Sequence, residues 1–374
     1  MNEIQTIKIS PFDTLFFRDG KPFTMSENSW ADGIFPPPPS VIYGALRAAY
    51  FSQHPEELKN VNTDEDPTRS LKIIKILYKN KDGLIFPAPL DILNVKKKNI
   101  DGPDEIVVFN KFSSGLKDAV TSSPFMPLIS DPEKNVENSS GGFVSEFFLM
   151  DYFENKIDLN CNPIIEQSSF CSEEPKIGIK RSLQTRTVEN GMLYRIGMKR
   201  VRDFSIIVSF SGIKPPLSDE GVLKLGGEGK TAYYDNKFSY KEILDIKEEI
   251  SDFFIYFSTP AVFKKGWIPD GIKEDFTTEI DGKKVTLVNA VIGKPELLGG
   301  FNMKSGTKNG KKIEKGPKPM KKAVPAGSIY YFSIENKEKM SVEKITNGFE
   351  KKFESEYSDQ GYTQFYVGNR KEGE

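Results

Sequence analysis

The chain opens with alternating hydrophobic and polar residues over positions 4–17, and the apolar members include Ile7, Ile9, Leu15 and Phe17. A period of two predicts a β-strand. The polar sequence at 18–22 holds a glycine and a proline and predicts a turn. Four prolines at 36–39 force an extended segment, and Ser40 is placed to cap a helix over residues 41–51. The first part of the chain therefore predicts a strand, a stiff loop and a buried helix.

Beyond this helix the pattern weakens, and residues 60–175 are predicted to be loops or insertions between short strands. Strand character returns at 204–210, 253–257 and 327–334. Residues 240–250 carry isoleucine and leucine on one side of a predicted helix. Short strands interleaved with few helices over two halves predict an α+β architecture. No repeat of solenoid length is visible in the sequence.

Length and composition favour a globular chain with two domains, and one large domain stays open as the alternative. With 374 residues the chain is longer than one hydrophobic core usually organises, and 37% hydrophobic residues suffice to build cores. The formal net charge is −1, so a polyanion site would have to come from local segregation of charge. The two cysteines lack zinc-site spacing, and neither a signal-peptide pattern nor a bilayer-long apolar run is visible. We therefore expect a cytoplasmic protein.

A glycine-rich sequence at residues 225–231 is the first candidate for chemistry. Three glycines in four positions let the backbone approach a phosphate closely, and Lys230 would add positive charge. The nucleotide-binding P-loop is excluded, because its signature needs a glycine where Lys224 stands. Two interpretations stay open at this point: a loop that grips an RNA backbone, and a tight turn between two strands.

Two basic segments are candidates for a polyanion surface. Residues 176–202 carry eight basic side chains, namely Lys176, Lys180, Arg181, Arg186, Arg195, Lys199, Arg200 and Arg202. Such charges, mixed with aromatic and β-branched residues, line grooves that follow a nucleic-acid backbone. Residues 304–322 carry eight lysines and a single acid among glycines and prolines, and are predicted to form a mobile arm. For both segments, a solvated hairpin or loop stays open as the alternative.

The residues supply little for catalysis. His54 is the only histidine. It lies near the end of the predicted first helix, where it could act as a general base or cap helix carbonyls. Asp13, Asp19 and Asp32 could form a metal site, although turn and cap roles are favoured for them. Zinc-protease and serine-hydrolase motifs are not present in the sequence. We therefore expect a chain that is not an enzyme and that holds no metal or cofactor.

The order of several motifs resembles that of a known family. The sequences Asp13-Thr-Leu-Phe-Phe-Arg-Asp-Gly-Lys-Pro-Phe23 and Phe35-Pro-Pro-Pro-Pro-Ser-Val-Ile-Tyr-Gly-Ala-Leu-Arg47 are similar to those of the third subunit of the Cmr complex. That complex is the type III-B CRISPR effector, and the subunit is a RAMP-superfamily protein. Further similarity follows in order at Lys176-Ile-Gly-Ile179, Leu193-Tyr194, Leu225-Gly-Gly-Glu-Gly-Lys230, Gly266-Trp-Ile-Pro269, Gly299-Gly300, Pro317-Lys-Pro319 and residues 323–332. The resemblance reaches both ends of the chain, while residues 60–175 contribute little to it.

The resemblance implies two ferredoxin-like (RRM-like, βαββαβ) domains with loop and hairpin insertions. The expected domains are residues 1–205, with a variable insertion at about 60–175, and residues 206–374, with a basic loop at 304–322. It also implies a non-catalytic subunit that binds the 5′ handle of the guide RNA (crRNA). The implied partners are the large polymerase/cyclase-like subunit and the backbone RAMP subunit, which carry the catalysis, with target RNA engaged indirectly through guide pairing.

One departure from the family pattern concerns the final loop. RAMP proteins usually carry a Gly-aromatic-Gly sequence there, and here Thr363 replaces a glycine, so this loop is expected to grip RNA less closely or to be only a turn. The residues expected to contact RNA are Arg18, Arg47, Lys180, Arg181, Arg186, Gly226, Gly227, Gly229 and Lys230. Two alternatives stay open. One is a protein–protein scaffold without RNA contact, and the other is a guide-processing endoribonuclease with His54 as its base.

Overall fold

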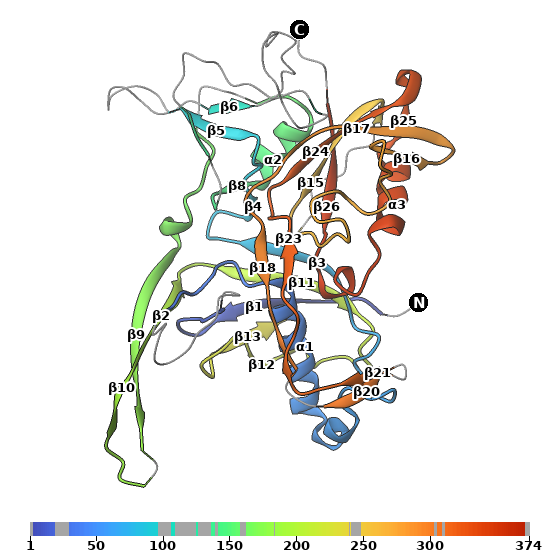
Figure 1. Cartoon of the computed structure of the whole chain (residues 1–374). Coiled ribbons are helices and arrows are strands. Elements are labelled where there is room, and N and C mark those ends of the chain that lie inside the picture. Colours follow the sequence, from blue (N-terminus) through green and yellow to red (C-terminus); the bar gives the residue numbers. More distant parts are fainter. Residues whose placement is uncertain are drawn as a thin grey trace.

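The computed structural model describes residues 3–18, 30–95, 106–108, 125, 136–138, 141–157, 162–182, 184–238, 240, 248–302, 305–308 and 311–370. These residues form a mixed α/β structure in which the two largest sheets are antiparallel (Figure 1). No helix in the described ranges is both long and apolar enough to span a bilayer.

The first sheet has seven strands in the order β12-β13-β1-β11-β3-β4-β8. Their bounds are β1 (Gln5–Pro11), β3 (Lys72–Lys79), β4 (Leu84–Pro87), β8 (Phe143–Ser145), β11 (Ser205–Ser211), β12 (Glu220–Lys224) and β13 (Thr231–Asp235). Helix α1 (Pro39–Gln53) covers one face, where Ile42 and Leu46 pack in the same core as Ile7 and Ile9 of β1. The predicted first strand and first helix are therefore confirmed, although β1 ends at Pro11 and not at residue 17.

The start of α1 differs from the prediction. Pro38 is the N-cap and Pro39 is the first helical residue, so Ser40 lies inside the first turn. Proline suits this position, because its fixed φ matches the helix and its missing N–H would have no helical partner. Ser40 instead accepts a hydrogen bond from the Tyr362 hydroxyl at 3.0 Å.

The second sheet has five strands in the order β16-β17-β24-β15-β26. Their bounds are β15 (Asp252–Phe257), β16 (Thr277–Ile280), β17 (Lys283–Val291), β24 (Ile329–Ile334) and β26 (Phe365–Asn369). Helix α3 (Val342–Phe353) packs on it through Phe349, which contacts Phe253 and Phe332. The strands predicted at 253–257 and 327–334 are confirmed. A helix was predicted at 240–250, and its residues 241–247 lie outside the described ranges. Its last two residues form the short strand β14 (Glu249–Ile250) and not a helix.

Helix α2 (Glu146–Phe153) lies where the two sheets meet. Leu77 and Ile207 of the first sheet share one buried cluster with Tyr256 and Tyr331 of the second, and Tyr152 of α2 belongs to the same cluster. The Tyr256 hydroxyl donates to the Pro87 carbonyl at 2.6 Å across this junction. The two sheets therefore bury part of their apolar surface against each other.

The segments that build the two sheets change over between Asp235 and Asp252. The reason is that β11 pairs with β1 and β3, and β13 pairs with β1, so that residues 205–235 complete the first sheet. The region predicted as a variable insertion also contributes to this sheet, since it supplies β3, β4 and β8. The division into two separate domains stays a prediction.

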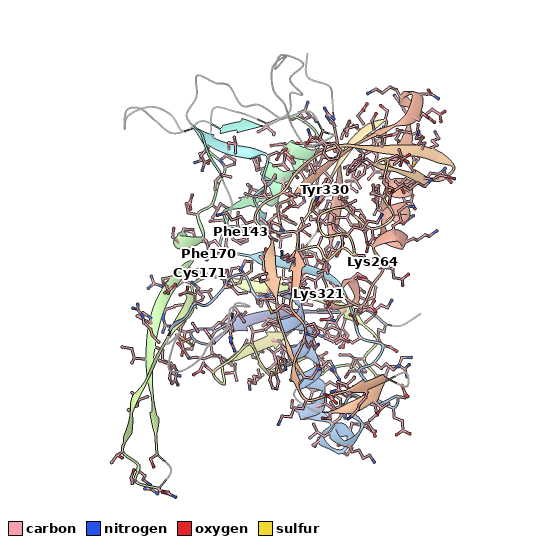
Figure 2. The ribbon with its side chains drawn as sticks, viewed as in Figure 1. Phe143, Phe170, Cys171, Lys264, Lys321 and Tyr330 are labelled. Atoms are coloured by element: carbon pink, nitrogen blue, oxygen red, sulfur yellow. The ribbon has the colours of Figure 1, made fainter. Side chains whose placement is uncertain are left out.

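A long two-stranded ribbon projects from the first sheet (Figure 1). It consists of β9 (Cys171–Arg181) and β10 (Val188–Val201), and we call it the β9–β10 ribbon. The short strand β2 (Trp30–Ala31) pairs with β10 near the base. Phe170 anchors this base, because its ring stacks on Phe204 at 5.5 Å and meets Phe143 at 5.4 Å (Figure 2).

A second extension, which we call the basic arm, comprises residues 296–323. Its strands pair two by two: β18 (Glu296–Leu298) with β23 (Lys321–Ala323), β19 (Phe301–Asn302) with β22 (Gly316–Pro317), and β20 (Gly306–Lys308) with β21 (Lys311–Ile313). The prediction of a loop at 304–322 was therefore wrong for the described part of the arm, while its mobility stays a prediction. Its described glycines and prolines fall within or beside paired strands.

Candidate nucleic-acid interface

The glycine loop at residues 225–230 is the turn between β12 and β13. Gly226 has a φ of +81°, and a Cβ there would lie 2.5 Å from the Phe16 carbonyl oxygen. The Gly227 amide donates a hydrogen bond to that same oxygen at 2.9 Å. Only glycine permits this backbone conformation and this close approach without strain. The two residues thus have a structural role against Phe16, and the Gly227 amide is directed at the protein's own backbone.

The other end of the loop is more open. Gly229 also has a positive φ, +68°, and nothing lies within 4 Å of the position that a Cβ would take. The Lys230 ammonium donates to Asp13 Oδ2 at 2.9 Å. This hydrogen bond is the main cause that lowers the pKa of Asp13 to about 2. Lys230 is therefore engaged by an acid, and Gly229 is the member of the loop with open space beside it.

Ion pairs join the loop to the base of the ribbon. Asp13 also contacts Arg200 Nη2 at 3.1 Å, and Arg200 in turn forms a two-pronged hydrogen-bonded pair with Glu174 of β9. Lys176 donates to Glu228 of the loop at 2.9 Å. Three segments that are distant in sequence are thus held together: the end of β1, the glycine loop and the ribbon.

The charges at this base are balanced. A further pair joins Lys199 to Glu173 at 3.0 Å, which gives four cations against four acids: Lys176, Lys199, Arg200 and Lys230 against Asp13, Glu173, Glu174 and Glu228. The sequence pattern indicated an excess of positive charge over residues 176–202. Because β9 and β10 are antiparallel, the acids of β9 reach the cations of β10, and the base is a neutral scaffold.

The outer half of the ribbon has a different character. Ile177 and Ile179 are 66% and 47% exposed, although both are large apolar side chains. On the opposite face the Tyr194 ring lies across Gly178, where a Cβ would come within 2.1 Å of the ring. Lys180 and Arg181 occupy the last positions of β9, and Arg186 is exposed in the turn that follows. The ribbon therefore combines apolar side chains on solvent with basic residues toward its tip.

Arg18 lies close to the base of the ribbon. It is exposed, and its backbone pairs with that of Gly33 in an isolated bridge. A Cβ at Gly33 would lie 2.2 Å from the Gly197 carbonyl oxygen of β10, so this glycine lets the segment pack directly on the ribbon. The structure thus brings Arg18, the glycine loop and the ribbon into one region.

Arg47 does not belong to this region. Its guanidinium on α1 contacts Asp66 Oδ2 at 2.5 Å and donates to Thr68 Oγ1 at 2.7 Å. Asp66 is buried and also accepts from the Asn62 amide at 2.9 Å. Burial by itself raises the pKa of Asp66, but the hydrogen bond from Thr68 and the charge of Arg47 leave that pKa lowered overall. Arg47 holds the loop at 60–68 in place, which the sequence pattern did not reveal.

The residues considered for catalysis have local roles. The His54 amide donates to the Tyr50 carbonyl at 3.0 Å and ends α1, and its imidazole lies 4.7 Å from the Tyr50 ring. Asp13 is engaged by Lys230 and Arg200, and Asp19 lies outside the described ranges. Within the described ranges, no group of three or more His, Cys, Asp or Glu side chains could hold a metal ion.

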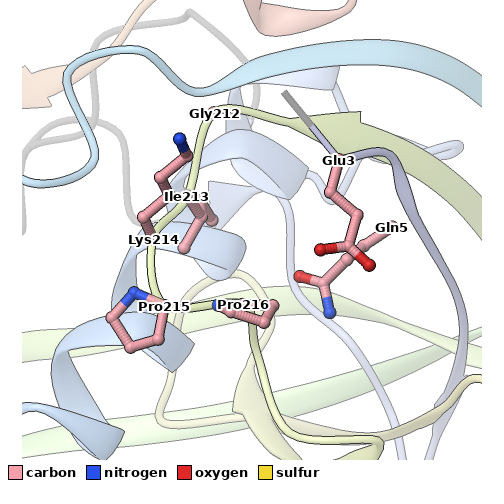
Figure 3. Close-up of a pocket in the computed structure, with 7 residues that line it drawn as sticks. All are labelled: Glu3, Gln5, Gly212, Ile213, Lys214, Pro215 and Pro216. Carbon is pink, nitrogen blue, oxygen red and sulfur yellow. The ribbon is translucent and has the colours of Figure 1, made fainter. Parts of the chain in front are cut away.

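A small hollow of 290 Å³ lies elsewhere, between the N-terminal strand and residues 212–216 (Figure 3). Gln5 forms one wall, and its amide makes two 3.0 Å hydrogen bonds with the backbone of Leu217. None of the residues expected to contact RNA lines this hollow.

The sequence matches the model of one known protein family. A family model described as "CRISPR-associated protein (Cas_Cmr3)" matches residues 7–370. No curated protein matches the chain.

Solved structures provide further matches. A chain of "Cryo-EM structure of the Type III-B Cmr-beta bound to cognate target RNA" is 17% identical, with 96% of each chain covered and a TM-score of 0.53. A second, from "Cryo-EM structure of the Type III-B Cmr-beta bound to cognate target RNA and AMPPnP, state 1", is 16% identical over 87% of this chain and 86% of that one, with a TM-score of 0.49. At such identities, the first likeness bears on the fold alone.

Proposed function

Because the chain belongs to the Cas_Cmr3 family of CRISPR-associated proteins, we propose that it is a non-catalytic subunit of a type III-B Cmr complex. In this proposal it holds the 5′ handle of the crRNA and bridges the large polymerase/cyclase-like subunit to the backbone RAMP subunit. The structural likeness to a chain of a Cmr-beta complex bound to cognate target RNA supports the proposal.

We also infer that the two sheets are the centres of two ferredoxin-like domains. Each sheet is antiparallel and carries a helix on one face, α1 on the first and α3 on the second. In the first sheet, the helix follows β1 along the chain, as the βα start of that fold requires.

The observation that carries the RNA-holding role is the β9–β10 ribbon. A two-stranded ribbon that projects from the body can reach along an RNA strand. Exposed Ile177 and Ile179 offer apolar contact to bases, and Arg186 near the tip offers positive charge to phosphates. The neutral ion-pair network fixes the base of the ribbon without itself attracting RNA. Contact is therefore expected along the outer half, where Lys180 and Arg181 also lie.

This distribution of charge is consistent with RNA binding that becomes tight only when the subunit is part of its complex. The net charge of the chain is −1, so the electrostatic attraction of the isolated subunit for a polyanion is small. The partner subunits would supply further contacts to the same RNA. We expect the purified chain to bind guide RNA weakly and the complex to bind it tightly.

Co-purification tests the proposal. A tagged chain is co-expressed with the genes of its complex, and the RNA and proteins that it recovers are measured. The ribbon variant, Lys180→Gln, Arg181→Gln and Arg186→Gln, is compared with a control variant, Lys81→Gln, Lys273→Gln and Lys339→Gln. The control removes the same number of charges at exposed lysines outside the ribbon and the basic arm.

The outcomes separate three functions. Loss of guide RNA from the ribbon variant, with the partner proteins retained and the control normal, supports the RNA-holding role. Retention of RNA by the ribbon variant would assign the ribbon to contacts with other subunits. Cleavage of repeat RNA by the purified chain, abolished by His54→Ala, would identify the subunit as an endoribonuclease.

A further inference from the structure

The basic arm is fixed at both of its ends. At its base, Leu298 and Ala323 are buried against Tyr362, and the adjoining Val324 pairs with Ala261. At its tip, a Cβ on Gly306 would lie 2.4 Å from the Asn62 carbonyl oxygen. The arm therefore runs from the second sheet to the loop after α1, as Figure 1 shows.

The loop that receives the tip is the one organised by Arg47. Asn62 accepts from Arg47 Nη2 at 3.5 Å and donates its amide to Asp66 at 2.9 Å. The tip of the arm thus rests on a segment that is already hydrogen-bonded to α1. This arrangement turns a glycine-rich sequence into an ordered ribbon, which holds its side chains in a defined row.

Four exposed lysines lie along the returning half of the arm without an acidic partner among the described residues, and we call them the lysine row: Lys315, Lys318, Lys321 and Lys322. Elsewhere in the structure many exposed lysines are paired, as Lys237 is with Glu220 and Lys344 with Asp281. The acid next to this row, Glu314, is paired with Lys312 at 3.2 Å. The row therefore presents uncompensated positive charge.

Gly300, which lies opposite this row, helps to place it. The Lys318 amide donates to the Gly300 carbonyl at 2.8 Å, and a Cβ on Gly300 would lie 3.1 Å from Lys318 Cδ. The aliphatic stem of Lys318 therefore lies across Gly300, and Lys318 as a whole is exposed. Lys321 continues the row on β23 (Figure 2). From Lys315 to Lys322 the row spans at most about 25 Å.

We propose that the basic arm is a second nucleic-acid surface, which holds a single RNA strand by its phosphates through Lys315, Lys318, Lys321 and Lys322. This inference rests on the proposed function, because it gives the same RNA a second point of attachment. The β9–β10 ribbon and the arm are separate extensions of the molecule, attached at different sheets. The two together would hold the RNA at two places.

The arrangement favours a phosphate backbone over an acidic protein surface. Lysine is a compact point charge on a flexible stem, and a row of lysines along an extended strand contacts regularly spaced charges without demanding a fixed fork geometry. The basic arm, residues 296–323, contains no arginine. It therefore fits sequence-independent attachment, which positions an RNA without reading its bases.

Salt-dependent binding tests the inference. Fluorescein-labelled guide RNA, recovered from the co-expressed complex, is titrated with the full-length chain, and the anisotropy is followed over a series of KCl concentrations. The arm variant carries Lys315→Gln, Lys318→Gln, Lys321→Gln and Lys322→Gln. The matched control carries Lys81→Gln, Lys273→Gln, Lys339→Gln and Lys351→Gln. Thermal melting of both variants checks that the fold is retained.

The arm variant should bind more weakly than the control at low salt. Its slope of log K against log[KCl] should be smaller by about 3, since each lost phosphate contact on a single strand contributes about 0.7. The control should keep the wild-type slope. An arm variant with the wild-type affinity and slope overturns the inference. So does an arm variant that keeps its RNA but loses a partner protein from the complex, because that result assigns the arm to protein docking.

The ribbon variant is measured in parallel, so that a failure of this inference can be distinguished from a failure of the proposed function. Normal binding by the arm variant, with weak binding by the ribbon variant, overturns this inference and leaves the proposed function standing. Weak binding by the arm variant and normal binding by the ribbon variant supports the arm and refutes the ribbon as the RNA contact. A wild-type chain that binds no guide RNA at any salt concentration overturns this inference, and the proposed function is then decided by the co-purification experiment.

Discussion

Replacing Asp91 by asparagine should stabilise the protein at neutral pH and should change how its stability responds to acid. Asp91 is 1% exposed at the junction of the two sheets. Its Oδ2 accepts hydrogen bonds from the hydroxyls of Tyr152 and Tyr331, both at 2.6 Å. Its Oδ1 is buried and has no hydrogen-bond partner among the described residues. The carboxylate is thus only half satisfied, and asparagine can keep both tyrosine bonds through its carbonyl oxygen.

The size of the effect follows from the pKa of this group. Burial raises the pKa of Asp91 from 3.8 to about 6, against the opposing effect of the tyrosine hydrogen bonds. A shift of about two units corresponds to about 3 kcal/mol, which is the disadvantage of the ionised form in the folded state. Between these two pH values the unfolded chain is ionised while the folded protein keeps the proton. The contribution of Asp91 to stability is therefore full below about pH 4 and is lost as the pH rises to about 6.

Urea unfolding, followed by intrinsic fluorescence from about pH 4 to about pH 8, measures this effect directly. We expect Asp91→Asn to exceed the wild type by about 1 to 3 kcal/mol at neutral pH and to lose this advantage at the acid end. Asp66→Asn is a control for which the opposite change in stability is expected. The pKa of Asp66 is lowered, so this variant should be less stable than the wild type at neutral pH and should approach it as the pH falls. An Asp91 variant that is destabilised by the same amount at every pH would refute the reasoning.

Two further predictions concern glycines. Gly226→Ala should destabilise the protein by at least about 1 kcal/mol more than Gly229→Ala in urea unfolding, because both have positive φ but only the first would clash with Phe16. Equal effects would show that close packing does not matter there. Gly306→Val should push the tip of the basic arm off Asn62 and make the arm lysines more sensitive to trypsin, with cleavage in the β9–β10 ribbon as the internal reference. Unchanged arm cleavage would show that the tip is not held by this contact.

Local patterns in the sequence were sufficient to predict several elements. The alternation before Pro11 and the helical spacing after Ser40 predicted β1 and α1, and the apolar runs predicted β15 and β24. These elements bury one face or both, and burial imposes its period on the sequence. The cap of α1 was mispredicted, because a proline at the N-cap leaves no side-chain oxygen to identify it.

Interactions between distant segments could not be predicted in the same way. Glu173 and Glu174 neutralise cations of β10 only because of the strand register, which the local pattern does not contain. Arg47 resembles a free cation in the sequence, since its partner Asp66 lies in a loop without periodicity. The pairing within the basic arm was hidden by its glycines and prolines, which are typical of flexible segments. For the candidate interface, the sequence indicated the right segments but not which of their charges are compensated.

The position of β1 within its sheet has a consequence for biosynthesis. This strand leaves the ribosome well before its two neighbours, β11 and β13, which end at Ser211 and Asp235. At roughly 5–20 residues per second, the ribosome needs roughly 10–40 s to deliver them. During that interval both edges of β1 are unpaired, and they could associate with other chains. Nascent chains that stop before Asp235 should therefore depend on chaperones, and soluble expression of the N-terminal half should require the sequence through β13.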